Sequence, residues 1–126
     1  MLTEKDYCDY DTCVALKELG YKGISRLFYA TKESPLRRYS YDQILTTRIA
    51  DAVGYTLAIS LYVAQKWLRE EKGMLLQPAY LELSDEWICV IRDKNKRHGC
   101  SAQKQKDYEE ALLEGIKAAV KILKGD

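Results

Sequence analysis

The sequence is poor in the residues that most often build metal-binding and catalytic sites. Its 126 residues contain one histidine, His98, and four cysteines, of which no two form a Cys-x-x-Cys pair. A structural zinc site needs four such ligands at tighter spacing. The sequence also lacks a glycine-rich phosphate-binding loop, a nucleophile elbow and a His-Glu-x-x-His motif. We therefore expect no metal, no cofactor and no catalytic residue, which predicts that the protein is not an enzyme.

An excess of one charge and long apolar runs are missing too. Twenty basic residues oppose 19 acidic ones, so the formal net charge is +1 and no global field attracts nucleic acid or an acidic membrane. No apolar run approaches the roughly 20 residues that cross a bilayer, and no charged-then-apolar leader opens the chain. The cysteines are then expected as reduced thiols. Together these features predict a cytoplasmic protein that makes no membrane contact.

The composition that remains is that of a globular protein. Hydrophobic residues make up 47% of the chain and charged residues 31%, with only two prolines. The length is typical of one domain, so we expect residues 1–126 to fold as a single domain. A chain of this length buries roughly two thirds of the surface that its unfolded form exposes, and it needs no disulfide or metal to stay folded.

Apolar residues at helical spacing predict two helices in the first two thirds of the chain. The first, of about ten residues, ends at Gly20, which is expected to adopt the left-handed conformation. Tyr21 can then pack back on Leu16, as at many helix C-termini. The second helix covers about 61–72.

A third helix is predicted near the end of the chain, with Asp107 as its N-cap. Its apolar stripe consists of Leu112, Ile116, Ala119 and Leu123. Gly115, in the middle of this helix, costs about 1 kcal/mol relative to alanine. Gly115 either allows another backbone segment to approach the helix closely or has no structural role.

Residues rich in β-branched and aromatic side chains predict four strands, over 24–30, 36–46, 75–83 and 87–92. The last two are expected to form a hairpin. Residues 44–58 fit either a short helix or a further strand.

The hairpin strands differ in their patterns. Pro78 cannot donate a backbone hydrogen bond, which suits a strand at the edge of a sheet. The run from Trp87 to Ile91 is apolar without a break, which is typical of a strand covered on both faces. The order helix, two strands, helix, two strands, helix predicts an α+β fold, with helices packed on one face of an antiparallel sheet. The helix-plus-hairpin unit occurs twice, which suggests a duplication.

Three stretches together resemble a known group of proteins. They are ALKELGY at 15–21, SL at 60–61 with AQKWLRE at 64–70, and YEEALLEGI at 108–116. The chain looks like a family of short uncharacterised proteins from gut Bacteroidetes, commonly encoded in prophages or other mobile elements. The resemblance implies a small accessory domain and transfers no functional residue.

The last third is also similar to HicB-type antitoxins, in which a Gly-Cys pair precedes an EEAL helix. Here Gly99-Cys100 is followed by Glu109-Glu110-Ala111-Leu112. Such proteins mask a toxin that cleaves RNA. The chain departs from their pattern in its long, lysine-rich linker after Cys100 and in lacking a C-terminal DNA-binding segment.

One segment, 92–106, is strongly basic. Its cationic residues, opposed by Asp93 alone, are Arg92, Lys94, Lys96, Arg97, Lys104 and Lys106. They could bind phosphates, with Tyr108 as a nearby stacking surface. The competing and favoured interpretation is a solvated connection between a strand and a helix.

Arg37, Tyr39 and Tyr41 form a second candidate surface, because alternate residues of a strand share one face. The chain has ten tyrosines, and tyrosine is favoured at contact surfaces. The alternative is that these rings line a shallow core. A catalytic role for Cys100, with His98 and Asp107, is disfavoured because residues this close in sequence rarely form a triad.

These observations predict a small binding or accessory protein that acts through macromolecular contacts, either with a protein partner or by self-association. The runner-up is a nucleic-acid-binding or HicB-like antitoxin module that uses the basic segment 92–106.

Overall fold

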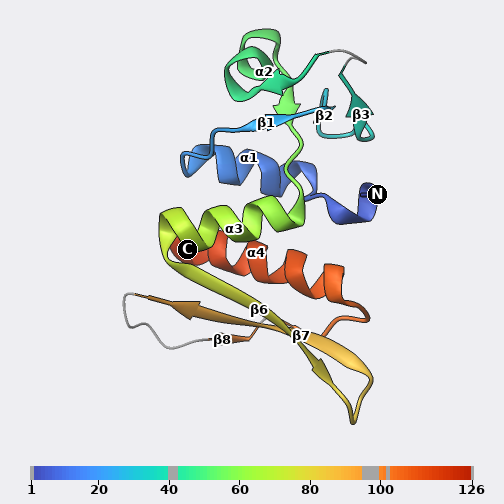
Figure 1. Cartoon of the computed structure of the whole chain (residues 1–126), viewed down its shortest axis with the longest axis vertical. Helices are drawn as coiled ribbons and strands as arrows, with labels where there is room; N and C mark the ends of the chain where they lie inside the picture. The colour runs from blue at the N-terminus through green and yellow to red at the C-terminus, as the bar shows by residue number, and fades with distance from the viewer. Residues whose placement is uncertain (1, 40–42, 95–99, 102, 126) are drawn as a thin grey trace. The chain divides into compact units, whose positions relative to one another are not determined.

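The computed structural model describes residues 2–39, 43–94, 100, 101 and 103–125 (Figure 1). The chain divides into two units, Met1–Ser60 and Leu61–Asp126, here called unit 1 and unit 2. Both combine helices with antiparallel strands, which confirms the predicted α+β class.

Unit 1 consists of short elements. Its sheets are the β1–β4 ladder and a three-stranded sheet in the order β3-β2-β5, and both are antiparallel. In chain order, the elements are the 3-10 helix η1 Glu4–Asp6, α1 Tyr10–Glu18, β1 Ile24–Ser25, β2 Leu27–Tyr29, β3 Arg37–Arg38, β4 Leu45–Thr46, α2 Thr47–Val53 and β5 Thr56–Leu57.

Both ends of α1 are set by local hydrogen bonds. The Asp9 side chain accepts the Thr12 N–H at 2.9 Å and caps the first turn. At the other end Gly20 has φ +107°, and the Tyr21 N–H donates to the Leu16 carbonyl at 3.0 Å. The predictions that α1 ends at a glycine with positive φ and that Tyr21 folds back on Leu16 are therefore confirmed.

The core of unit 1 lies between α1, α2 and the short strands. Leu16 on α1, Leu45 on β4 and Ala50 on α2 are all buried. Phe28 on β2 is buried as well, and its ring stacks on Tyr55 with centroids 4.3 Å apart. Residues from distant positions in the sequence thus share one small core.

The tract 36–46 departs from the prediction. Among its described residues, 36–39 and 43–46, strand forms only at β3 and β4. The ambiguous tract that follows contains α2 and β5. The Thr46 hydroxyl accepts the Ile49 N–H at 3.2 Å and starts α2, and Gly54, with φ +80°, ends it. The predicted element order and the duplication are therefore not confirmed.

Unit 2 follows the prediction closely. The hairpin pairs Leu76 with Ile91 and Tyr80 with Trp87, and β8 adds a short third strand beside β7. In chain order, the elements are α3 Leu61–Lys72, β6 Met74–Leu81, β7 Glu86–Asp93, β8 Cys100–Ser101 and α4 Tyr108–Lys124.

Pro78 lies in β6, an edge strand of this sheet, as predicted. The Lys94 N–H donates to the Gly73 carbonyl at 2.9 Å. Because antiparallel pairs alternate, the backbone groups of every second residue from Met74 onward, Pro78 included, point to the free edge. The missing N–H of Pro78 therefore costs the sheet no hydrogen bond.

Both helices of unit 2 lie on the same side of the sheet (Figure 1). The side chains that face them are buried, namely Met74, Leu76, Cys89 and Ile91. The alternate residues Ile88 and Val90 are only half-buried. Within the described part of unit 2, both helices pack on one face of β7, so this unit does not itself supply the predicted cover of the second face.

Gly115 marks the closest approach of α4 to β7. A Cβ at this position would collide with the Cys89 sulfur and would lie 2.9 Å from its Cβ. The glycine is thus required by packing. The Asp107 side chain accepts the Glu110 N–H at 2.9 Å, which confirms the predicted cap of this helix.

None of the described helices is long and apolar enough to span a bilayer.

We expect Gly115→Ala to destabilise the protein although alanine is the better helix former. The methyl group has no space beside Cys89, and overpacking costs about 1–3 kcal/mol, which exceeds the about 1 kcal/mol gained in helix propensity. Urea unfolding followed by circular dichroism measures the difference. The double variant that carries both Gly115→Ala and Cys89→Ala should recover part of the lost free energy of unfolding, because the sulfur that collides with the methyl group is removed. A stabilised Gly115→Ala variant would contradict the packing argument.

Candidate functional site

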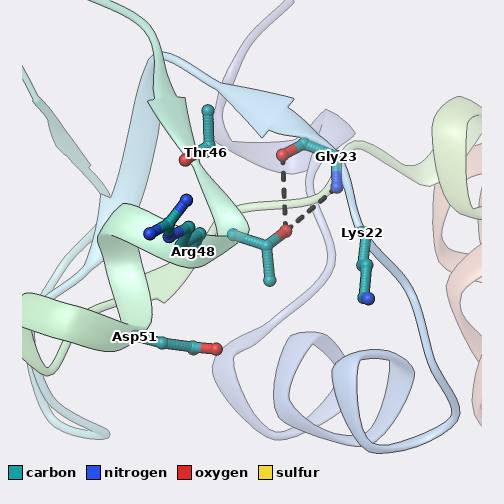
Figure 2. A pocket seen from close by; sticks show the side chains of 6 residues that line it. Lys22, Gly23, Thr46, Arg48 and Asp51 are labelled. Atoms are coloured by element: carbon teal, nitrogen blue, oxygen red, sulfur yellow. Dashed lines mark hydrogen bonds between the residues drawn. The ribbon is translucent and has the colours of Figure 1, made fainter.

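Unit 1 has an open surface pocket of about 560 Å³ (Figure 2). It lies where β1 and the turn before it meet β4 and the start of α2. The residues that line it are Lys22, Gly23, Thr46, Thr47, Arg48 and Asp51. All but Lys22 and Gly23 come from a tract whose structure the sequence left open.

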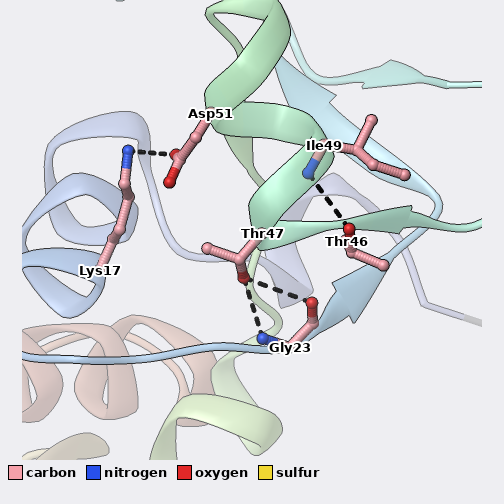
Figure 3. Close-up of polar contacts among 6 residues, drawn as sticks. All are labelled: Lys17, Gly23, Thr46, Thr47, Ile49 and Asp51. Carbon is pink, nitrogen blue, oxygen red and sulfur yellow. Dashed lines mark hydrogen bonds and ion pairs between the residues drawn. The ribbon is translucent and has the colours of Figure 1, made fainter.

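The Thr47 hydroxyl joins the two walls of the pocket (Figure 3). It accepts the Gly23 N–H at 2.9 Å and donates to the Gly23 carbonyl at 3.3 Å. Gly23 itself has no space for a side chain, because a Cβ would collide with the Tyr21 ring. The Thr47 N–H also donates to the Gly23 carbonyl, at 3.1 Å, so the side chain and the backbone of Thr47 together join the two walls.

The charges around the pocket are mostly positive. Asp51 forms an ion pair with Lys17 of α1, so its charge is compensated (Figure 3). Lys22 and Arg48 are exposed, and neither has an acidic partner among the described residues. An open pocket with two such cations suits an acidic or otherwise anionic surface of a partner.

A second cavity, of about 10 Å³, is bordered by Thr47 and Asp51, which also line this pocket. It is bordered by Cys13 and Lys17 of α1, by Tyr21, and by Ala50 of α2. A cavity of this size is at the limit for one water molecule. It can therefore hold no substrate.

Cys8 and Cys13 are free, adjacent and fully buried. The Cys13 thiol donates to the Cys8 carbonyl at 3.6 Å, and the Tyr29 hydroxyl donates to the same oxygen at 2.8 Å. Hydrogen bonding to Cys13 and burial raise the pKa of the Cys8 thiol well above its usual value. A buried thiol that resists ionisation is a poor nucleophile, and it acts here as part of the core.

The basic segment predicted as a candidate site is described only in part. Arg92, Lys94, Lys104 and Lys106 are exposed, whereas Lys96 and Arg97 lie outside the described residues. Gln105, which lies between Lys104 and Lys106, pairs with Trp87 through two backbone hydrogen bonds of 2.7 Å each. Lys104 and Lys106 are thus held beside the sheet of unit 2.

The second predicted surface lies in unit 1. Arg37 is exposed on β3, opposite Phe28. The Tyr39 ring contacts the Phe28 ring edge to face, with centroids 6.1 Å apart. Tyr39 therefore lies at the border of the core, as the alternative interpretation expected, and Tyr41 lies outside the described residues.

The sequence interpretation missed the pocket because it did not resolve 44–58. A signal was available, since Thr46 and Gly54 bracket the apolar Ile49, Ala50 and Val53 at helical spacing. This is the pattern of an N-cap followed by a glycine stop. Cys100, weighed as a nucleophile, lies in β8, and His98 is outside the described residues.

The described ranges contain no group of three His, Cys, Asp or Glu residues that could hold a metal ion. Comparison with protein-family models, with curated proteins and with solved structures finds no match for this chain.

We expect Thr47→Val to destabilise unit 1 by about 1–3 kcal/mol, because it leaves the Gly23 N–H without its hydroxyl partner, whereas the Gly23 carbonyl still accepts the Thr47 N–H at 3.1 Å. Thr47→Ser keeps the hydroxyl and is the matched control, with a smaller loss expected. Chemical denaturation of both variants measures the difference. Equal losses in the two variants would show that the methyl group, and not the hydroxyl, joins the walls of the pocket.

Proposed function

We propose that this chain is a small cytoplasmic binding protein that acts through contacts with another protein and carries out no reaction of its own. The observation that carries this proposal is the set of exposed aliphatic side chains on β1 and α2 and directly before β4, which are elements that contribute to the unit 1 pocket. They come from the elements that build it or directly precede them: Ile24 (63% exposed), Ile44 (43%), Ile49 (42%) and Val53 (51%). Exposed aliphatic groups gathered on a few neighbouring elements are typical of interaction sites.

The chemistry of this surface favours a protein partner with acidic groups. The aliphatic side chains lie on the same elements as the cations Lys22 and Arg48. An apolar centre gives affinity, and charges around it steer the partner and fix its orientation. Cys8 and Cys13, adjacent but not bonded to each other, support the proposed cytoplasmic location because disulfides are rare there.

An accessory role in a prophage or other mobile element is part of the same proposal. It rests on the resemblance of residues 15–21, 60–70 and 108–116 to the Bacteroidetes family.

The binding proposal predicts which side chains a partner contacts. The full chain serves as bait in affinity capture from the native host, and mass spectrometry identifies the captured proteins. With Ile24→Asp and Ile49→Asp combined, we expect recovery of the partner to fall at least about tenfold, because two apolar contacts are replaced by charges. Both side chains are exposed, so circular dichroism should show an intact fold.

Leu83→Asp is the matched control, since Leu83 is the most exposed large apolar residue described and lies in unit 2. It should leave recovery unchanged. Capture that is equal for the wild type and the double variant would refute a binding role for this surface.

A nucleic-acid-binding or HicB-like antitoxin role is the second candidate. It is favoured by the pairing of Gln105 with Trp87, which presents Lys104 and Lys106 side by side with a fixed backbone. Phosphates would then contact these lysines, and counterion release would make the affinity strongly dependent on salt.

Gel retardation of mixed-sequence oligonucleotides tests this candidate at about 50 mM salt and above. We expect Lys104→Ala with Lys106→Ala to lower the slope of log affinity against log salt by about 2. Lys121→Ala with Lys124→Ala, on α4, removes the same charge and should leave the slope unchanged. Absence of retardation at the lowest salt concentration would eliminate the nucleic-acid role.

A further inference from the structure

The sheet of unit 2 has a second face that neither α3 nor α4 covers (Figure 1). It carries the alternate residues of the hairpin and is here called the open face. Its aliphatic members are Leu75, Ala79 and Leu81 of β6 with Ile88 and Val90 of β7, and its polar members are Gln77, Glu86 and Arg92. More than half of the open face is therefore apolar.

The composition of this face indicates that something covers it. Where one face of an antiparallel sheet meets water, polar residues normally alternate with apolar ones. In β7 the open-face positions Ile88 and Val90 are as apolar as the buried Cys89 and Ile91 beside them. A strand of this kind is typical of a sheet packed on both sides.

The free edge of β6 is less suited to association than the open face. Pro78 has no N–H to offer an added strand, and the Gln65 side chain already donates to the Leu76 carbonyl at 2.8 Å. Both features block the pairing of another strand along β6. Association is therefore expected through the face of the sheet.

We propose that the open face binds the same face of a second copy of this chain, across a two-fold axis that lies between the sheets perpendicular to the strands. The proposal deepens the proposed binding function, on which it rests, by naming one partner. Such an axis reverses the strands and stacks β7 on β7. Glu86 then faces Arg92 of the second copy, and Arg92 faces Glu86 of the second copy.

Charge complementarity between two identical open faces is the argument that the partner is a second copy of this chain. Glu86 and Arg92 lie on the same face, about 20 Å apart at 3.3–3.4 Å per residue, at the two ends of the apolar stretch. Reversal of the strands brings opposite charges together at both ends. It also places Leu75 against Leu81, Ile88 against Val90 and Gln77 against Ala79, so that two of these three pairings are between apolar side chains.

Single-stranded nucleic acid fits the open face less well. Bases stack on aromatic rings, and the open face has none. The aromatic residues of this region, Tyr80, Trp87 and Tyr108, contact one another at centroid distances of 5.3 and 5.5 Å. Tyr80 and Trp87 occupy positions that alternate with those of the open face, and they lie on the helix-covered side of the sheet.

Sedimentation velocity of the purified full chain, without other components, tests the inference. The face of two eight-residue strands is smaller than the roughly 800 Å² per partner of a standard interface, so we expect a dissociation constant in about the micromolar range. The protein is therefore examined from about 5 to 500 µM, and its mass should rise from one chain to two. A monomer throughout this range overturns the inference.

Charge reversal tests the geometry without disturbing the fold. Glu86→Arg and Arg92→Glu should each weaken self-association about tenfold or more, because each places like charges together at both ends. The double variant with both changes, and an equimolar mixture of the two single variants, should each recover affinity to within about threefold of the wild type. Arg69→Glu, an exposed reversal on α3, is the matched control and should have no effect.

A dimer that is insensitive to these reversals, or that is not rescued by the mixture, also overturns the inference. Failure here is distinguishable from failure of the proposed function, since the unit 1 surface is tested by capture of a different protein. Val90→Asp provides a second readout. It should reduce self-association at least tenfold, as roughly expected when a charge is buried among apolar groups, and thermal unfolding checks that the variant still folds.

Discussion

Helices cover one face of the unit 2 sheet, and the rest of that unit depends on this asymmetry. The covered face demands close packing, so α4 carries Gly115 where the Cys89 side chain needs its space. Because side chains of a strand alternate, the same register sends an equal number of residues to the other side. Those residues are largely aliphatic, and their exposure to water is unfavourable. The packing of the helices on the covered face therefore fixes which side chains lie on the open face.

Unit 1 depends on a different constraint, a hydroxyl that joins segments 24 residues apart. Thr47 satisfies both backbone groups of Gly23 and thereby fixes the distance between the two walls of the pocket. Such short strands contribute few hydrogen bonds of their own, so this side-chain contact carries much of the local order. The cations Lys22 and Arg48 line the pocket, and the exposed aliphatic side chains Ile24, Ile49 and Val53 lie on the same segments. Their positions thus depend on a few local contacts, namely this hydroxyl, the Thr47 N–H on the Gly23 carbonyl and the short β1–β4 ladder.

The two surfaces share a chemistry that is suited to recognition. Each combines aliphatic side chains with charged groups at the margin, as protein interfaces commonly do. The thiols of Cys8, Cys13 and Cys89 are buried, and in Cys8 burial and a hydrogen bond oppose ionisation. These groups stabilise the core. The proposal of a binding protein follows from where the apolar side chains are exposed, in each of the two units.

Local signals in the sequence determined the helices at 10–18, 61–72 and 108–124, the hairpin and its edge proline, because caps, glycine stops and periodicity act within a few residues. The same signals did not resolve 36–58, where strands of two residues are too short to show a period. Whether Gly115 admitted a neighbour was also undecided by sequence. Only the tertiary structure assigned Cys89 to that space, brought Thr47 to Gly23 and placed α3 and α4 on the same face of the unit 2 sheet, since each depends on which distant segments meet.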